Sequence, residues 1–305
     1  MKVVISILMI VLTMIFLIGC NTFQPVVEEY HEEPLIEEKP SKTPTGMEEE
    51  LDAEDEVIEG SLVDQPFEEL VAFMEEKYEN REPKIFGENI PGVYTSIDTG
   101  EKVVALTLDA CGGTHGNGYD EELMAYLKKE NIKATLFLNG RWIEANEALA
   151  ASLAMDPLFE IENHGSFHKP LASRGQSIYG IQGTASIAEI LEEVVWNHHR
   201  IQNQTGKSPR YFRSGTAYYD DVALAIVEEL GIKVVNFDVL GDAGATYSKE
   251  QMLATSHRVK EGSILLFHMN QPQSEIAQGI PLVVESLRAR GYTFVHLSPY
   301  DEFLK

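Results

Sequence analysis

The chain has 305 residues, with 49 acidic residues against 24 lysines and arginines, so its net charge at pH 7 is -25. Its hydrophobic content of 44% is ordinary for a globular protein. The charge argues against nucleic acid and anionic lipid surfaces as electrostatic partners, because both are polyanions.

The first twenty residues, MKVVISILMIVLTMIFLIGC, have the pattern of an export signal. Lys2 precedes an apolar run that is shorter than the roughly 20 residues needed to span a bilayer. The run closes in Leu-Ile-Gly-Cys, which resembles the bacterial lipobox. We therefore expect a lipoprotein signal peptide over residues 1–20, with lipid on Cys20 holding the protein at the extracytoplasmic face of the bacterial membrane. The alternative is an uncleaved membrane anchor.

Residues 21–66 contain fifteen acidic residues and two lysines, together with several prolines. Such a segment buries too little apolar surface to offset its ordering entropy, and its like charges keep it extended. We predict a disordered acidic linker here. If Cys20 carries lipid, Cys111 is the one remaining cysteine, which leaves no internal disulfide.

After the linker, apolar spacing predicts an amphipathic helix over 67–78, within a lead-in that ends at residue 83. In residues 84–305, seven short apolar segments alternate with helical patterns. The predicted strands are 102–109, 133–139, 158–163, 210–213, 233–238, 263–268 and 292–297. The predicted helices are 120–131, 141–154, 187–206, 219–231, 249–262 and 280–291. This order predicts an α/β domain with about seven parallel strands in a closed or nearly closed barrel; a doubly wound open sheet is the alternative.

Functional residues of such folds gather where the strands end. Ionisable residues end five of the seven predicted strands: Asp109; His164 and His168; Arg213; Asp238 and Asp242; and His268. His164 and His168 are four residues apart and can bind one metal ion. In contrast, the adjacent pair His198 and His199, in the middle of a helix, is expected on the surface.

The stretch LDACGGTHGNG delivers Asp109 and Cys111 onto a glycine-rich loop. Gly112, Gly113, Gly116 and Gly118 are expected to allow positive φ angles there. Asp120 is the better candidate for capping the next helix, which leaves Asp109 free for catalysis. Arg213 would orient Asp109 and lower its pKa. His268 would supply an acid with a pKa near neutrality.

These residues resemble the NodB-homology polysaccharide deacetylases, carbohydrate esterase family four. The likeness covers about residues 84–300 and five ordered motifs: TLDACGG, HGSFH, the segment beginning at Arg213, FDVLGDAG, and Leu266-Phe267-His268. The fold implied by the resemblance is a deformed (β/α) barrel, in agreement with the strand pattern.

The resemblance also implies residue roles. Asp109 would be the general base, and His164 and His168 would bind a divalent metal, usually zinc. Arg213 would position Asp109, and His268 would be the general acid. Three further residues would assist: the backbone N–H of Thr216 near the oxyanion, Leu266 in the acetyl pocket, and Asp242 tuning His268.

The sequence departs from the family pattern at three motifs. Ala110 replaces the aspartate that is normally the third metal ligand, the third motif reads Arg-Ser-Gly-Thr, and Asp238 and Asp242 are spaced one residue wider than usual. We hypothesise that Cys111 is the missing ligand, since thiolate and imidazole suit zinc. His115 or a water could serve instead, and Cys111 could be a small buried apolar residue.

The expected function is removal of N-acetyl groups from a cell-envelope polysaccharide. A lipid-anchored enzyme outside the membrane would meet peptidoglycan first, and secreted or capsular polysaccharide and chitin fragments are alternatives. Two other functions remain open: an inactive glycan-binding lipoprotein, and an esterase acting on O-acetyl groups.

Overall fold

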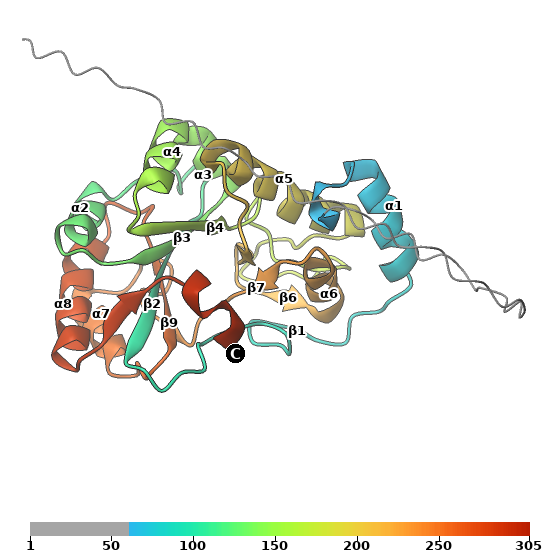
Figure 1. The fold of residues 1–305 in the computed structure, drawn as a ribbon. Coiled ribbons are helices and arrows are strands. Elements are labelled where there is room, and N and C mark those ends of the chain that lie inside the picture. Colours follow the sequence, from blue (N-terminus) through green and yellow to red (C-terminus); the bar gives the residue numbers. More distant parts are fainter. Residues whose placement is uncertain (1–60) are drawn as a thin grey trace, which may run out of the picture. The chain divides into compact units, whose positions relative to one another are not determined.

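The computed structural model describes residues 61–305 (Figure 1). The predicted signal peptide, Cys20 and the linker as far as residue 60 lie outside the described residues. A short 3-10 helix, η1 (Leu62–Asp64), occupies the last residues of the predicted linker, and its Val63 is buried in a hydrophobic cluster. Val63, from the end of the predicted linker, therefore contributes to the core of the folded part.

A parallel sheet forms the centre of the described chain. Its strand order is β7-β5-β4-β3-β2-β9-β8, and β10 also pairs with β2. All of these pairs are parallel, which confirms the predicted sheet. The strand bounds are β2 (Val103–Ala110), β3 (Ala134–Leu138), β4 (Phe159–Asn163), β5 (Tyr211–Phe212), β7 (Lys233–Val234), β8 (Val239–Leu240), β9 (Ser263–His268) and β10 (Thr293–Val295).

The two edge strands of this sheet, β7 and β8, follow one another in the sequence. The segment from Val234 to Val239 therefore spans at most about 18 Å, the reach of five extended residues. The edges approach one another, yet no backbone ladder joins β7 to β8 within residues 61–305. The sheet is thus an incompletely closed barrel, in agreement with the nearly closed barrel expected from the strand pattern and with the deformed barrel that the resemblance implies.

Strand β2 lies at the centre of the sheet, and all eight of its residues are buried. Along one edge it pairs with β9 from Val104 to Asp109. Along the other edge it pairs first with β10 and then with β3. This register sets Asp109 directly opposite His268, so two chemically reactive side chains leave the sheet side by side.

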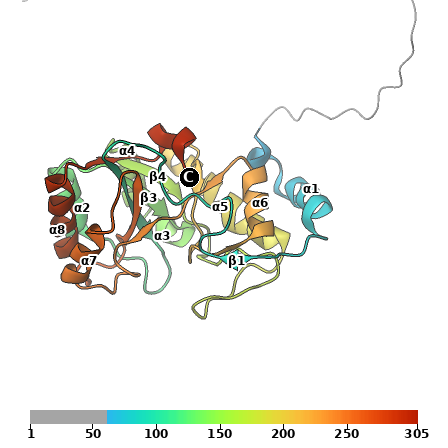
Figure 2. The ribbon, with the colours of Figure 1, turned by 90° about the horizontal axis from the view of Figure 1, so that it is seen from below.

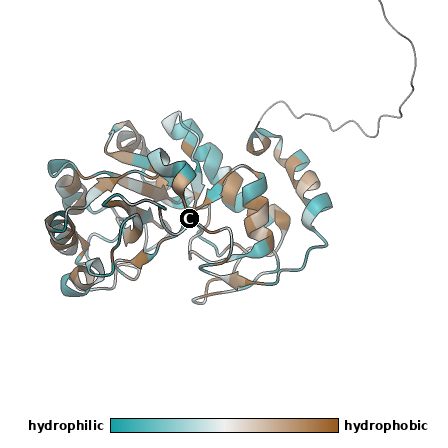
Figure 3. Cartoon of the chain, turned by 60° about the horizontal axis from the view of Figure 1, so that its bottom comes forward, coloured by the Kyte–Doolittle hydropathy of each residue, from teal (hydrophilic) through white to brown (hydrophobic). Residues whose placement is uncertain are grey.

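Helices cover the sheet in two groups. Figures 1 and 2 show α2, α7 and α8 at one end and α1, α5 and α6 at the other. Each helix carries both hydrophobic and hydrophilic residues, as Figure 3 shows, and the apolar residues supply the buried clusters. The bounds are α1 (Phe67–Tyr78), α2 (Glu121–Lys129), α3 (Gly140–Ala145), α4 (Glu147–Met155), α5 (Ile187–Thr205), α6 (Asp221–Glu229), α7 (Lys249–Ser256) and α8 (Ile276–Ala289).

Most predicted helices are confirmed, with α1 matching residues 67–78 in full. Asp120 caps α2, as expected, by accepting a hydrogen bond from Leu123 N at 3.0 Å. The single helix predicted over 141–154 is two helices, because Asn146 leaves helical geometry with φ -136° and ψ 38°. Helix α8 begins at Ile276, one turn before its predicted start.

Two short strands escaped prediction. β1 (Phe86–Gly87) and β6 (Tyr219–Asp220) form a separate antiparallel pair. The helix predicted from residue 219 therefore begins at Asp221, with Asp220 as its cap. No described helix combines the length and apolar character needed to cross a membrane.

Candidate metal and catalytic site

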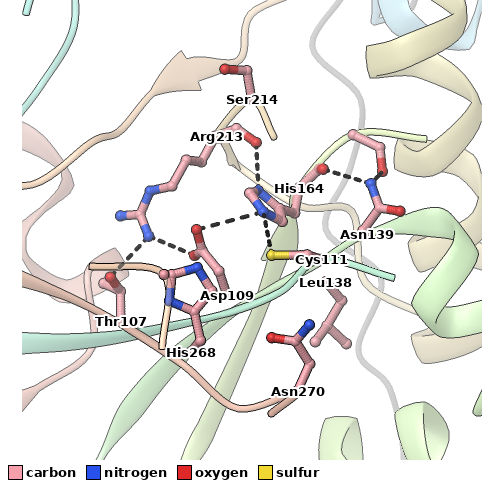
Figure 4. Close-up of polar contacts among 12 residues, drawn as sticks. Thr107, Asp109, Cys111, Leu138, Asn139, His164, Arg213, Ser214, His268 and Asn270 are labelled. Carbon is pink, nitrogen blue, oxygen red and sulfur yellow. Dashed lines mark hydrogen bonds and ion pairs between the residues drawn. The ribbon is translucent and has the colours of Figure 1, made fainter. Parts of the chain in front are cut away.

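The carboxyl ends of four strands open onto one pocket of about 800 Å³. Asp109 comes from the end of β2, His168 from the loop after β4, and His268 from the end of β9, while Ser214 follows β5. Figure 4 shows Asp109, Cys111, His164 and Arg213 linked by polar contacts around this point. Other lining residues that the sequence singled out are Cys111, His115, Thr216 and Leu266.

Arg213 is fully buried and holds Asp109 in place. Its Nη1 donates to Asp109 Oδ1 at 2.8 Å and to Thr107 Oγ1 at 2.9 Å. Its Nε and Nη2 donate to the carbonyl oxygens of Val235 and Asn236. The guanidinium also lies 4.0 Å from the centre of the Phe137 ring, a cation–π contact. With these partners, the buried charge is paired and hydrogen-bonded.

The charges around Asp109 keep its carboxylate ionised. Burial raises the pKa of Asp109, but the positive charges of Arg213 and His268 hold it below the ordinary value of an aspartate. The second carboxylate oxygen, Oδ2, lies 3.5 Å from His164 Nε2. Asp109 is therefore a carboxylate with one oxygen held by Arg213 and the other facing His164.

His164 is oriented by the backbone on its far side. Its Nδ1 lies 2.9 Å from the carbonyl oxygen of Arg213, which can only accept, so Nδ1 carries the proton and Nε2 presents a lone pair. Burial lowers the pKa of His164 more than Asp109 raises it, which favours the neutral ring. A neutral imidazole with its other N–H bound to a carbonyl is the form in which histidine binds metals.

His168 has a strained backbone. Its backbone has φ 64°, a conformation that non-glycine residues rarely adopt. A Cβ on Gly215 would clash with the His168 ring, so only glycine leaves room for it there. The buried Nε2 of His168 has no hydrogen-bond partner within residues 61–305. Such an orphaned polar atom calls for a ligand.

Cys111 faces both histidines from the loop after β2. Its Sγ lies 3.9 Å from His164 Nε2. Burial raises the pKa of the Cys111 thiol, but the imidazoles of His168 and His268 lower it by a larger amount, so the resulting pKa is about 6. A thiol with such a pKa is largely thiolate at neutral pH, the form that binds metal ions.

The ligand atoms of Cys111, His164 and His168 all lie within 4.8 Å of one another. Among the described residues, this is the only such group of three. Together with the orphaned Nε2 of His168, the donor set of two imidazoles and one thiolate fits a zinc ion with an open fourth position. Ala110 is buried beside it and offers no ligand atom, and the exposed His115 lines the pocket outside this group.

His268 is backed by the buried carboxylate of Asp242. Its Nδ1 lies 2.9 Å from Asp242 Oδ1, and its backbone N donates to Oδ2 at 2.7 Å. Burial lowers the pKa of His268, but Asp242 and Cys111 outweigh this and raise it well above its ordinary value. With Nδ1 occupied by Asp242, Nε2 is the atom that can give a proton to a group in the pocket.

A buried glutamate braces the loop that carries His168, and sequence reasoning missed it. Glu193 lies on α5, and its carboxylate accepts hydrogen bonds from Phe167 N at 2.8 Å and Lys169 N at 3.0 Å. Burial raises the pKa of Glu193. Glu193 lies three residues after the apolar Ile190, and residues three apart share one face of a helix. This spacing is the signal that would have placed Glu193 on the buried side of α5.

Two amides fix the chain around His164. Asn139 Nδ2 donates to the carbonyl oxygens of His164 and Gly165. Asn163 Oδ1 accepts from Gly165 N at 2.9 Å, so the turn after β4 has its backbone groups satisfied from both sides.

The structure corrects the placement of Asp238. Its carboxylate accepts from Ser263 Oγ and Ile264 N at the start of β9, whereas the pocket lies at the other end of that strand. The reason is that residues 233–238 are not one strand: β7 ends at Val234, and β8 begins only at Val239. Asp238 therefore precedes β8 instead of ending a strand.

The surface assignment of His198 is also wrong. His198 is buried, with burial lowering its pKa to about 4, whereas His199 is partly exposed and lies 3.5 Å from Asp64. The cause is a second covered side of α5, where η1 and Val63 pack.

Only two of the four loop glycines have positive φ: Gly112 at 70° and Gly113 at 85°. Gly116 and Gly118 are required for a different reason. A Cβ on Gly116 would clash with the Gly112 carbonyl, and one on Gly118 would lie 2.7 Å from the Asn270 carbonyl oxygen.

Comparison with known proteins supports a polysaccharide deacetylase domain. Residues 96–235 match the family model described as polysaccharide deacetylase. A bifunctional xylanase/deacetylase of Pseudobutyrivibrio xylanivorans is 24% identical over 203 residues, which make up 66% of this chain and 31% of that protein. The peptidoglycan-N-acetylmuramic acid deacetylase PdaA of Bacillus subtilis is 24% identical over 229 residues, 70% of this chain and 80% of PdaA.

A solved structure gives a similar result. A mutant of a CE4 family pseudoenzyme with restored enzymatic activity, from Bacillus anthracis, aligns with a TM-score of 0.56 and 25% identity. The alignment covers 66% of this chain and 68% of the other. The present chain spans less than a third of the xylanase/deacetylase.

Proposed function

We propose that this protein is a metal-dependent hydrolase that removes N-acetyl groups from a cell-envelope polysaccharide, either peptidoglycan or a related N-acetylglucosamine glycan. One observation carries the proposal. A paired carboxylate, two imidazoles, a thiol and a separate protonated imidazole line or border a single pocket at the strand ends. Packing alone gives no reason for this combination of groups.

Cys111, His164 and His168 would hold the metal, which we propose is zinc, with Cys111 in place of the carboxylate that Ala110 lacks. When bound, a zinc ion would polarise the amide carbonyl and lower the pKa of a water to about 7. The tautomer of His164 and the orphaned Nε2 of His168 support this role.

The protein's own groups would carry the protons. Asp109, ionised and fixed by Arg213, accepts the proton of the attacking water. His268, kept protonated by Asp242, donates from Nε2 to the departing amine, which is a poor leaving group without that proton. The backbone N–H of Thr216 would stabilise the oxyanion, and Leu266 would contact the acetyl methyl group.

Location follows from the first twenty residues. We infer that Cys20 carries a lipid and that the acidic segment after it keeps the domain away from the membrane surface. Peptidoglycan is then the nearest acetylated polymer. Metabolic labelling with a fatty acid analogue tests this inference, and Cys20→Ser should abolish labelling.

Acetate release from purified N-acetylated peptidoglycan tests the activity. We expect release that a chelator abolishes and added zinc restores. Glycan binding without acetate release would instead support the inactive glycan-binding alternative. Release from O-acetylated but not N-acetylated polymer would support the esterase.

A further inference from the structure

The segment between His168 and α5 forms a projecting hairpin on the rim of the pocket. Residues 173–184 leave the body of the domain and return to it, in yellow-green in Figure 2. At the tip, Ile178 and Ile181 exchange both backbone hydrogen bonds, at 3.2 and 2.9 Å. Tyr179 and Gly180 form the two-residue turn between them.

The base of this hairpin is firmly held. Thr184 is buried, and its hydroxyl both accepts from Ala172 N and donates to Ala172 O. Ser173 donates from its backbone N and its hydroxyl to the buried Asp220. The tip is therefore carried on a rigid support.

The turn at the tip contains a residue that is unfavourable for its backbone conformation. Tyr179 has φ 55° and Gly180 has φ 75°, the two positive angles of a type I′ turn. Asparagine, aspartate and glycine are the residues that suit the first of these positions. A tyrosine there is strained, and its ring is 72% exposed. Neither the turn nor the core explains why an aromatic residue occupies this position.

The ring borders the catalytic pocket. Tyr179 and Ile181 line the same cavity as Asp109 and His268, together with Glu88. Tyr218 packs against Tyr179, with ring centres 5.7 Å apart in an edge-to-face arrangement. The part of the pocket lined by Tyr179 and Glu88 thus offers both an aromatic surface and a carboxylate.

We propose that Tyr179 is a stacking platform for a sugar ring adjacent to the one that carries the acetyl group. Sugar rings present C–H faces that pack on aromatic rings, and their hydroxyls can donate to a carboxylate such as Glu88. A pocket of about 800 Å³ is large enough for a drug-sized ligand, and hence for more than one sugar. Tyr179 thereby makes the site prefer a polymer over a short acetylated sugar. The identity of the ligand rests on the proposed function.

The test compares chain lengths in variants that separate the ring from the turn. Tyr179→Asn removes the ring and installs the Asn-Gly pair that suits a type I′ turn, so the backbone is preserved. Tyr179→Trp retains a flat aromatic surface. Phe303→Ala is the matched control, since Phe303 is 54% exposed and lies outside the pocket.

For each protein, kcat/KM is measured with the monomer and the hexamer of N-acetylglucosamine, because the monomer lacks the adjacent sugar ring. We expect the hexamer-to-monomer ratio to fall by about twofold to tenfold in Tyr179→Asn, the range for one aromatic contact. Tyr179→Trp and Phe303→Ala should keep the wild-type ratio. An unchanged ratio in Tyr179→Asn, or no preference for the hexamer in the wild type, overturns the proposal.

Binding is measured separately with the glucosamine hexamer, which has no acetyl group to lose. Suppose that the wild type releases no acetate but Tyr179→Asn binds the glucosamine hexamer more weakly than the wild type does. The hydrolase proposal would then be wrong, and the role of Tyr179 as a stacking platform would be supported. If both proteins bind the hexamer equally and acetate release is intact, the stacking role of Tyr179 would be wrong and the hydrolase proposal would be supported.

Discussion

Asp109 and His268 lie directly opposite one another on neighbouring parallel strands, β2 and β9. The register alone brings a carboxylate and an imidazole side by side without any loop having to fold over them. Each is then given a different partner: Arg213 holds Asp109, and Asp242 holds His268. The two partners drive the pKa values in opposite directions, so at neutral pH one group is a base and the other an acid.

Replacing the base should remove activity but not metal. We expect Asp109→Asn to lower kcat by about 10²- to 10⁴-fold, because an amide of nearly the same shape cannot accept the proton. Zinc content, measured by atomic absorption, should stay at the wild-type level, since the ligand group comprises Cys111, His164 and His168. Loss of zinc in Asp109→Asn would mean that Asp109 is itself a ligand.

The pH dependence of kcat/KM should reflect the pKa values of both Asp109 and His268. Asp109 must be ionised and His268 protonated, so kcat/KM should fall in acid below the lowered pKa of Asp109 and in alkali above the raised pKa of His268. Asp242→Asn removes the charge that raises the pKa of His268, so the alkaline limb should move to lower pH. The acid limb should not move.

Asp238→Asn is the matched control for this experiment. Asp238 belongs to the same segment of chain, but its carboxylate is bonded at the far end of β9. Its profile should equal that of the wild type. An alkaline limb that stays in place in Asp242→Asn would refute the assignment of His268 as the acid.

Cys111 should determine both the affinity for metal and the preferred type of metal. Cys111→Ala should weaken zinc binding by more than the roughly 10- to 100-fold that losing an outer hydrogen-bond partner costs. Cobalt bound to the wild type should give the near-ultraviolet absorption band of a thiolate ligand, and Cys111→Ala should lack it. Cys111→Asp restores a charged ligand and should recover zinc without that band. Equal zinc affinity in all three proteins would rule out Cys111 as a ligand.

Glu193 should act on the metal through the loop that it braces. In Glu193→Gln one carboxylate oxygen becomes an amide that cannot accept from the backbone, so the hydrogen bond of Phe167 N or Lys169 N is lost. We expect zinc affinity to fall by about 10- to 100-fold. Glu192→Gln, on the neighbouring, half-exposed position, should bind zinc normally. Equal affinity in both variants would contradict this positioning role.

The convergence of Asp109, His164, Arg213 and His268 could be predicted because parallel strands share one functional edge. It required only that each residue be assigned to the end of a strand. Asp238 was misplaced because only the first two residues of the predicted six-residue strand form β7, and β8 begins after Asp238. The apolar pattern of residues 233–238 does not mark the point where β7 ends.

The burial of Glu193 and His198 could not be deduced in the same way. Which sides of α5 are covered depends on α1 and η1, which come from a distant part of the chain. Local periodicity describes one buried stripe, whereas α5 has more than one covered side. Likewise, Gly116 and Gly118 are required by neighbours that become adjacent only after folding.

The saturated bonding of Arg213 bears on how divergent relatives should be judged. Removing either member of the Asp109–Arg213 pair would strand a charge in the interior, at a typical loss of about 3–5 kcal/mol of stability. Selection for folding stability alone would thus preserve both residues, even in a relative that had lost its catalytic activity. Within residues 61–305, His168 supports no neighbour through its Nε2, so its replacement becomes tolerable once the metal is dispensable. The presence of a histidine at position 168 should therefore distinguish active from inactive homologues better than the presence of the Asp109–Arg213 ion pair.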